Sequence, residues 1–191
     1  MCGWSRRATE MRAYKRHDPG RGQSLAEMAV VIPVLFFLLM GGFDATIMIA
    51  DRVTAGSAVR QAARLAAELG GTQTNPGATT SQIDLQIVHD ALAVARSLTS
   101  ASVTEIDIYA PSQADGIYRP GDPVDQYLIS SGGAISPGTQ TFPIQNRLQI
   151  PPTETSIGVR LVWNYSPPAG IFPKNMQIVE YAVMKAAPVL V

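Results

Sequence analysis

Residues 21–69 read RGQSLAEMAVVIPVLFFLLMGGFDATIMIADRVTAGSAVRQAARLAAEL, and this stretch decides the fold. A basic segment ends at Gly22, and Glu27 follows shortly after it. Asp44 is then the only charged residue in the 23 residues from position 28 to position 50. In helical form this run spans about 34 Å, more than the ~30 Å hydrocarbon core of a bilayer. The sequence therefore predicts a membrane-spanning helix.

The same helix is predicted to continue well beyond the apolar run. Small and apolar residues recur at helical spacing at Ala55, Ala58, Val59, Ala62, Leu65, Ala66 and Leu69. Ser24 and Glu27 fit an S-x-x-E capping box at the start, and Gly70-Gly71 fits a stop. We therefore expect one helix from about Ser24 to Leu69, with a bend near Pro33, where one backbone donor is missing.

Two blocks of this stretch resemble a known family. RGQSLAEMAVVIPVLF has a leader glycine, a glutamate five residues beyond it and a proline six residues further on. VRQAARLAAELG is an arginine- and alanine-rich helical block. Over residues 21–71 the chain resembles the TadE-like pseudopilins of bacterial Tad (tight adherence) pili, a branch of the type IV pilin-like proteins.

The resemblance implies roles for four residues near the N-terminus. A prepilin peptidase would cleave after Gly22 and leave Gln23 as the new N-terminus; the alternative is a cytoplasmic tail that is never cut. Glu27 would pair with the freed amine of Gln23 on a neighbouring subunit, whereas the simpler interpretation is a helix cap at the membrane surface. Pro33 is either a structural bend or a site where the helix melts during assembly.

Small residues in the outer part of the span favour close helix packing. Gly41 with Ala45, and Gly42 with Thr46, are small-xxx-small pairs of the kind that pack in lipid. Asp44 lies among them. It is expected to reach the outer membrane interface, and the alternative is a contact between subunits in a pilus bundle.

Charge is unevenly distributed, although the formal net charge is zero. Residues 1–22 carry six Lys and Arg against two acidic residues, or +4, and residues 23–191 carry nine against thirteen, or −4. A basic flank before an apolar span places the N-terminus in the cytoplasm. The expected organisation is a cleaved basic leader over residues 1–22, a transmembrane helix over 23–50 and an extracytoplasmic α+β domain over 51–191.

The remainder predicts a second helix and a small antiparallel sheet. A helix is expected from about Gln82 to Leu98, with Ser81 as N-cap and Asp84 in its first turn. Strands are expected at Ser102–Tyr109, Thr155–Tyr165 and Met176–Lys185, where apolar residues alternate, although the last segment also contains good helix formers. Residues 111–143 are predicted to form a long excursion with one short edge strand at 127–129. The fold class is therefore α+β, pilin-like, with three or four strands.

Catalytic and metal-binding motifs are absent from the sequence. His17 and His89 are isolated, and the single cysteine, Cys2, permits neither an internal disulfide nor a cysteine-based metal site. Asp115, Asp122 and Asp125 fit no recognised calcium loop and are predicted to be solvated turn residues. No enzyme activity, cofactor or metal is expected, and the acidic mature chain argues against nucleic acid as a partner.

Two functions from different classes compete. The first is a minor pilin-like structural component of a Tad-type pilus system for adhesion and secretion. Its partners would be the cytoplasmic membrane, the prepilin peptidase, other pilin-like subunits and the Tad assembly platform proteins. The second is a single-pass membrane protein whose outer domain binds a ligand, with no pilus role. Both place the protein in the bacterial cell membrane as a single-pass protein, and the first also allows a place in the pilus.

Overall fold

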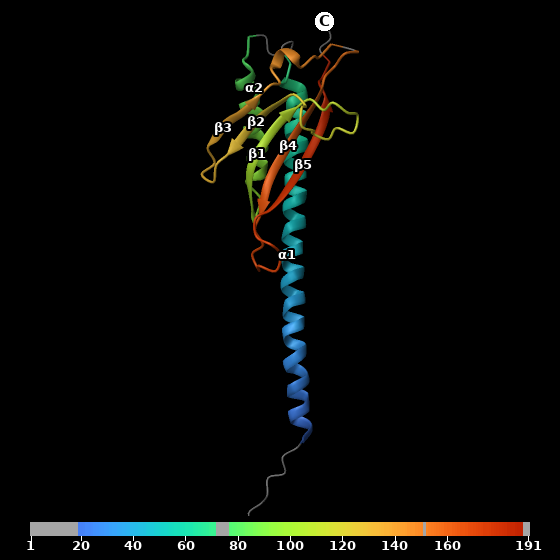
Figure 1. Cartoon of the computed structure of the whole chain (residues 1–191), viewed down its shortest axis with the longest axis vertical. Helices are drawn as coiled ribbons and strands as arrows, with labels where there is room; N and C mark the ends of the chain where they lie inside the picture. Colours follow the sequence, from blue (N-terminus) through green and yellow to red (C-terminus); the bar gives the residue numbers. More distant parts are fainter. Residues whose placement is uncertain (1–18, 72–76, 151, 189–191) are drawn as a thin grey trace, which may run out of the picture. The chain divides into compact units, whose positions relative to one another are not determined.

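The computed structural model describes residues 19–71, 77–150 and 152–188 (Figure 1). The chain divides into two compact units, residues 1–39 and residues 40–191. Its elements, in order, are α1 (Pro19–Leu69), α2 (Thr80–Ala95), β1 (Ala101–Tyr109), β2 (Val124–Ile129), β3 (Ile135–Gln140), a 3-10 turn (Ile144–Asn146), β4 (Ser156–Tyr165) and β5 (Met176–Lys185). The leader before residue 19, including Cys2 and His17, lies outside the described residues.

Helix α1 confirms the predicted end but not the predicted start. It ends at Leu69, where the amide of Gly70 still donates to the carbonyl of Ala66 over 2.8 Å. It begins at Pro19, so Ser24 is an interior residue of the helix and the predicted capping box is wrong. Pro33 lies inside the helix, which continues through it.

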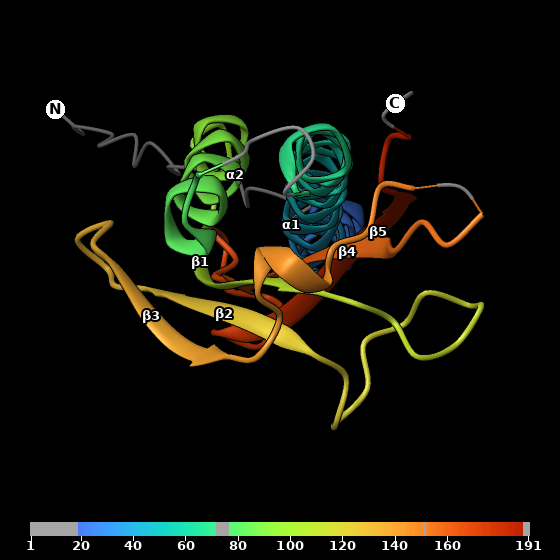
Figure 2. The ribbon, with the colours of Figure 1, turned by 90° about the horizontal axis from the view of Figure 1, so that it is seen from above.

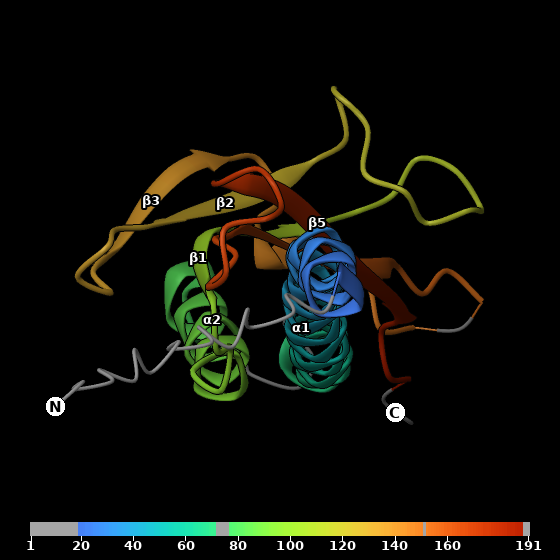
Figure 3. The same cartoon turned by 90° about the horizontal axis from the view of Figure 1, so that it is seen from below.

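The second unit is an antiparallel sheet with helices on one face. The strand order is β3-β2-β1-β4-β5, and every neighbouring pair is antiparallel. Two end-on views show α2 and residues 40–69 of α1 on the same side of this sheet (Figure 2 and Figure 3). The α+β class is confirmed, with five strands instead of three or four.

The core lies between the helices and the sheet. The apolar stripe of α1 is buried at Ala55, Ala58, Val59, Ala62, Ala63 and Ala66, and Leu65 and Leu69 pack at its margin. Alternate residues of β1 and β4 face it, with Ile106, Ile108, Leu161 and Trp163 fully buried. Because the α1 stripe is mostly alanine, the helix backbone can lie close to the sheet.

Residues 111–143 differ most from their prediction. They contain the β2–β3 hairpin, and β2 is an internal strand paired with β1 on its other side. The part before the hairpin covers the outer face of β1. There the hydroxyl of Tyr109 donates to the carbonyl of Gly116 over 2.6 Å, and the rings of Tyr109 and Tyr118 meet edge to face at 5.4 Å. The predicted long excursion is therefore a packed part of the fold, and its predicted edge strand at 127–129 is part of the internal strand β2.

Helix α2 starts two residues earlier than expected. Thr79, and not Ser81, is the N-cap, and it forms a capping box with Gln82. Asp84 therefore lies beyond the first turn and does not interact with the helix start as predicted. The last strand, β5, is confirmed, and its helical alternative is wrong.

A buried ion network joins α2 to the hairpin. The guanidinium of Arg147 is fully buried and bonds to Asp84 at 2.5 Å and to Asp125 at 2.9 Å. It also donates to the carbonyl of Phe142, and the Tyr127 hydroxyl donates to Asp84. Burial raises the pKa of Asp84 to about 6, although Arg147 opposes the shift. The two carboxylates share one buried cation, so loss of Arg147 would leave both of them buried without a counter-charge.

Candidate functional site

The N-terminal half of α1 exposes a continuous apolar surface. Its large side chains are each more than half exposed. They are Leu25, Met28, Val30, Val31, Ile32, Val34, Leu35, Phe36, Phe37, Leu38, Leu39 and Phe43. In the part of the chain that the structure describes, α1 is the one helix long and apolar enough to cross a membrane. An exposed apolar surface of this size needs a covering, and the hydrocarbon core of a bilayer has the matching chemistry.

Glu27 stands at the edge of this surface. Its carboxylate is exposed and accepts a hydrogen bond of 3.2 Å from the side-chain amide of Gln23, one helical turn earlier. Gly22 lies in the same helix, directly before Gln23. The chain therefore holds Gln23 and Glu27 on one helix face, beside the predicted processing point.

The two predicted small-residue pairs, Gly41 with Ala45 and Gly42 with Thr46, differ in their surroundings. Gly42 faces open space, and the hydroxyl of Thr46 donates to the Gly42 carbonyl over 2.8 Å. Gly41 lies against the chain's own Ile171, whose Cγ2 would be 3.8 Å from a Cβ at position 41. Ala45 is partly buried. Gly42 and Thr46 therefore remain open to a neighbouring helix, whereas Gly41 is occupied from within the chain.

Asp44 has a role that the sequence did not indicate. Its side chain is fully buried, and its carboxylate accepts the backbone amides of Ala169 at 2.8 Å and Ile171 at 3.0 Å. The Tyr165 hydroxyl donates to its backbone carbonyl over 2.7 Å. Asp44 therefore holds the β4–β5 loop onto α1, and the charge faces this loop.

Asp51 repeats this arrangement two turns later, and sequence reasoning missed it. It is buried, and its two carboxylate oxygens accept the amides of Thr99 at 2.7 Å and Ser100 at 3.0 Å, just before β1. Spacing could have indicated it. Asp44 and Asp51 are seven residues apart, and they continue the stripe that Ala55 and Ala58 begin. A charge on the buried stripe of a helix is expected to have partners.

The aspartates of the excursion are not the solvated group that was predicted. Asp122 and Asp125 are buried; the first accepts the amides of Ser112 and Arg119, and the second bonds to Arg147. Only Asp115 is exposed, and its hydrogen bond from the Arg119 guanidinium lowers its pKa to about 2. Among the described residues no group of three or more His, Cys, Asp or Glu could hold a metal ion.

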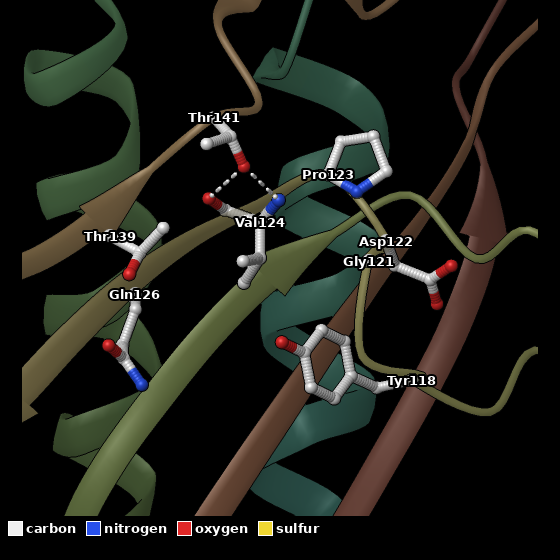
Figure 4. Close-up of a pocket in the computed structure, with 8 residues that line it drawn as sticks. All are labelled: Tyr118, Gly121, Asp122, Pro123, Val124, Gln126, Thr139 and Thr141. Carbon is white, nitrogen blue, oxygen red and sulfur yellow. Dashed lines mark hydrogen bonds between the residues drawn. The ribbon is translucent and has the colours of Figure 1, made fainter.

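A pocket of about 400 Å³ lies where this excursion meets β2 and β3 (Figure 4). Its lining comprises Tyr118, Gly121, Asp122, Pro123, Val124, Gln126, Thr139 and Thr141. The Thr141 hydroxyl already accepts the Val124 amide and donates to the Val124 carbonyl, as the dashed lines show. Asp122 is likewise engaged by backbone amides. Asp122 and Thr141 are therefore engaged within the chain, and Tyr118, Gln126 and Thr139 supply the other polar side chains of the lining.

Comparison with known proteins finds a match to the N-terminal helical segment of the chain. No curated protein and no solved structure matches the chain. Residues 22–64 match the family model described as TadE-like protein. This match includes Gly22, Glu27 and Pro33, and it extends past Asp44 and Asp51 into the buried stripe. The resemblance predicted for residues 21–71 is therefore confirmed over residues 22–64, where the N-terminal helical segment is similar to TadE-like proteins.

Proposed function

We propose that this protein is a minor pilin-like structural and assembly component of a Tad-type pilus system, and not an enzyme. The TadE-like segment supports an association with a Tad pilus. The long exposed apolar helix supports a single-pass membrane anchor. The partners we propose are the cytoplasmic membrane, the prepilin peptidase, other pilin-like subunits and the Tad assembly platform proteins.

The observation that carries this proposal is the position of Glu27. It is exposed, and the sixteen uncharged residues from 28 to 43 begin directly after it. A carboxylate at the edge of a lipid-buried surface loses hydration and gains from a cationic partner. Cleavage after Gly22 would give Gln23 an α-amine of this kind, and Glu27 would bind the amine of a neighbouring subunit.

Glu27→Gln tests this role. The amide keeps the size of the side chain and removes the charge that attracts an amine. Opposite charges 4 Å apart attract by about 4 kcal/mol at an intermediate dielectric, and desolvation offsets much of this. We expect the variant to insert normally, because an uncharged side chain enters lipid more easily. Crosslinking to neighbouring pilins and the number of surface pili should both fall.

Glu68→Gln is the matched control. Glu68 lies on the same helix and pairs with Arg64 at 2.9 Å, and both side chains are exposed. Exposed pairs of this kind contribute little, so the control should assemble as wild type does. If Glu27→Gln also crosslinks and supports pili like wild type, Glu27 has no assembly role, and the main support for a pilin-like function is lost.

The pocket in Figure 4 is the feature that would favour the alternative, a membrane-anchored binding module without a pilus role. Two of its polar side chains, Asp122 and Thr141, are engaged within the chain. The family match covers residues 22–64 and none of the residues that line this pocket, so the pilin-like function is the better supported one.

A further inference from the structure

The loop between β4 and β5 has the composition of a membrane-surface contact. Residues 166–175 read SPPAGIFPKN, with three prolines, one lysine and no acidic residue. Ile171 is 42% exposed, Phe172 is partly buried, and Lys174 is exposed. Large apolar residues beside a lysine suit the headgroup region of a bilayer, where apolar atoms enter the acyl boundary and the ammonium meets phosphate.

The loop is held in a defined place on α1. The Asp44 carboxylate binds the amides on both sides of Gly170, and Gly170 has a φ of +74°, which glycine adopts without strain. The Ile171 side chain then lies against Gly41, almost one turn nearer the N-terminus than Asp44. Figure 1 shows this loop beside α1, at the end of the sheet away from residues 110–123.

The short length of the uncharged run implies that the site where the loop contacts α1 lies at the membrane surface. Residues 28–43 are sixteen in number. At 1.5 Å per residue they span only about 24 Å, less than the ~30 Å hydrocarbon core of a typical bilayer. A bilayer that buries this run must thin or must draw in the residues that follow it. Those residues begin with Asp44 and the loop bound to it. The loop supplies two amides to the carboxylate and so spares it direct contact with lipid.

We propose that residues 167–174 form a second membrane contact, which rests in the lipid headgroup region of the bilayer that α1 spans. Ile171 enters the interface beside Gly41, and Lys174 meets lipid phosphate. The contact fixes the folded unit at the membrane surface and shields Asp44 there. This inference rests on the proposed membrane anchor.

Site-directed fluorescence in the full chain tests the contact. In a Cys2→Ser background, which removes the single native cysteine, Ile171→Cys is labelled with an environment-sensitive nitrobenzoxadiazole dye. The protein is reconstituted in phosphatidylethanolamine–phosphatidylglycerol vesicles, with or without lipids that carry a spin label at the headgroup. Ile117→Cys is the matched control, because Ile117 is 43% exposed and belongs to the connection at the opposite end of β1 and β4. Leu35→Cys reports insertion of the anchor itself.

We expect a blue-shifted emission at position 171, with quenching by the spin-labelled lipid severalfold stronger than at position 117. Equal quenching at 171 and 117, with Leu35→Cys in lipid, overturns the loop contact and leaves the anchor intact. A dye at 171 that is protected from aqueous iodide but not quenched by lipid shows a protein covering, and this also overturns the proposal. A water-exposed dye at position 35 rejects the anchor, and the loop contact with it.

Discussion

Buried aspartates connect the parts of the folded unit, and they do so in two chemically different ways. Asp44 and Asp51 on α1 bind backbone amides of distant loops. Asp84 and Asp125 instead surround the Arg147 guanidinium. In both arrangements the donors compensate the loss of hydration that burial of a carboxylate entails. Each aspartate therefore fixes one pair of elements.

Asp107 on β1 has fewer hydrogen bonds to compensate the loss of hydration of its buried carboxylate. One carboxylate oxygen bonds to Arg160, and the other is buried without a hydrogen-bond partner among the described residues. Glu105 shares the same guanidinium at 3.0 Å. Burial, and next the nearby Glu105, raise the pKa of Asp107 to about 7, while Arg160 opposes the shift. The protonated form of Asp107 is therefore favoured in the folded state up to neutral pH.

Stability should consequently fall as pH rises through the range from about 4 to about 7. In this range the folded chain holds a proton on Asp107 that the unfolded chain has released, and each shifted pKa unit corresponds to about 1.4 kcal/mol. Asp107→Asn should flatten this slope, and Asp84, with a pKa of about 6, should supply the part that remains. Chemical denaturation of the detergent-solubilised chain at several pH values measures the slope.

Asp115→Asn is the control for this series. Its pKa is lowered to about 2, so any stability that Asp115 provides is present above about pH 4 and is lost only at lower pH. The slope between pH 4 and 7 should not change in this variant. A slope in Asp107→Asn equal to that of wild type would show that Asp107 does not titrate in this range.

At the scale of elements, two aspartates attach α1 to the ends of two strands. Asp51 binds the chain just before β1, and Asp44 binds it just after β4. These strands are antiparallel neighbours, with Ala101 opposite Tyr165, so both attachments lie at the same end of the sheet. Residues 44–51 of α1 are thus bound to the sheet at this end.

Asp51→Ala should weaken this attachment. The change leaves two partly buried amides, of Thr99 and Ser100, without their acceptor. We expect a loss of about 1–3 kcal/mol in the free energy of unfolding, the typical cost of an unsatisfied buried donor. Asp90→Ala is the control, because partly buried Asp90 bonds only weakly to Gln61, at 3.2 Å. Chemical denaturation measures the free energy of unfolding of both variants. An equal loss in the two would contradict the role of Asp51 in attaching α1 to the sheet.

Elements with a strong local pattern were predictable from the sequence. The alanine stripe of α1 and the alternation in β1 and β4 gave the helix-on-sheet arrangement. Strand β3 was missed because its residues, ISPGTQ, contain a proline and a glycine and are almost all exposed, so no alternation arises. The register of its pairing with β2 depends on a partner strand and not on its own residues.

The identity of the groups that Asp44 and Asp51 bind was beyond local sequence patterns. The amides that Asp44 binds lie 125 and 127 residues further along the chain, and those that Asp51 binds lie 48 and 49 residues away. No pattern within α1 contains these donors. In contrast, Gly22 and Glu27 could be proposed as site residues, because both lie in α1 and their spacing to each other carries the family resemblance.

At the scale of the whole molecule, the second compact unit begins at Met40, eleven residues before the domain start predicted at position 51. The difference arises because Asp44, Ile47 and Met48 are buried in or packed against the folded unit. Hydropathy alone assigns Ile47 and Met48 to the membrane span. The exposed uncharged run is therefore shorter than the apolar run in the sequence.

Orientation in the membrane is predicted from charge. The +4 leader and the −4 remainder should keep the N-terminus in the cytoplasm and place the sheet outside. Alkaline phosphatase fused after Val191 is active only outside the cytoplasm, and this fusion should be active. Green fluorescent protein fluoresces in the cytoplasm but stays dark when it is exported in unfolded form. Its fusion at the same position should therefore stay dark. A bright fluorescent fusion with an inactive phosphatase would reverse the orientation.

The most direct test of a pilin-like function is the mature N-terminus. The full chain is expressed with a prepilin peptidase that cleaves a co-expressed pilin, and the purified membrane form is analysed by mass spectrometry. We predict that the wild-type chain begins at Gln23 and that Gly22→Ala keeps the leader. A wild-type chain that retains Met1, while the co-expressed pilin is cleaved, would contradict the assignment as a processed pilin-like subunit.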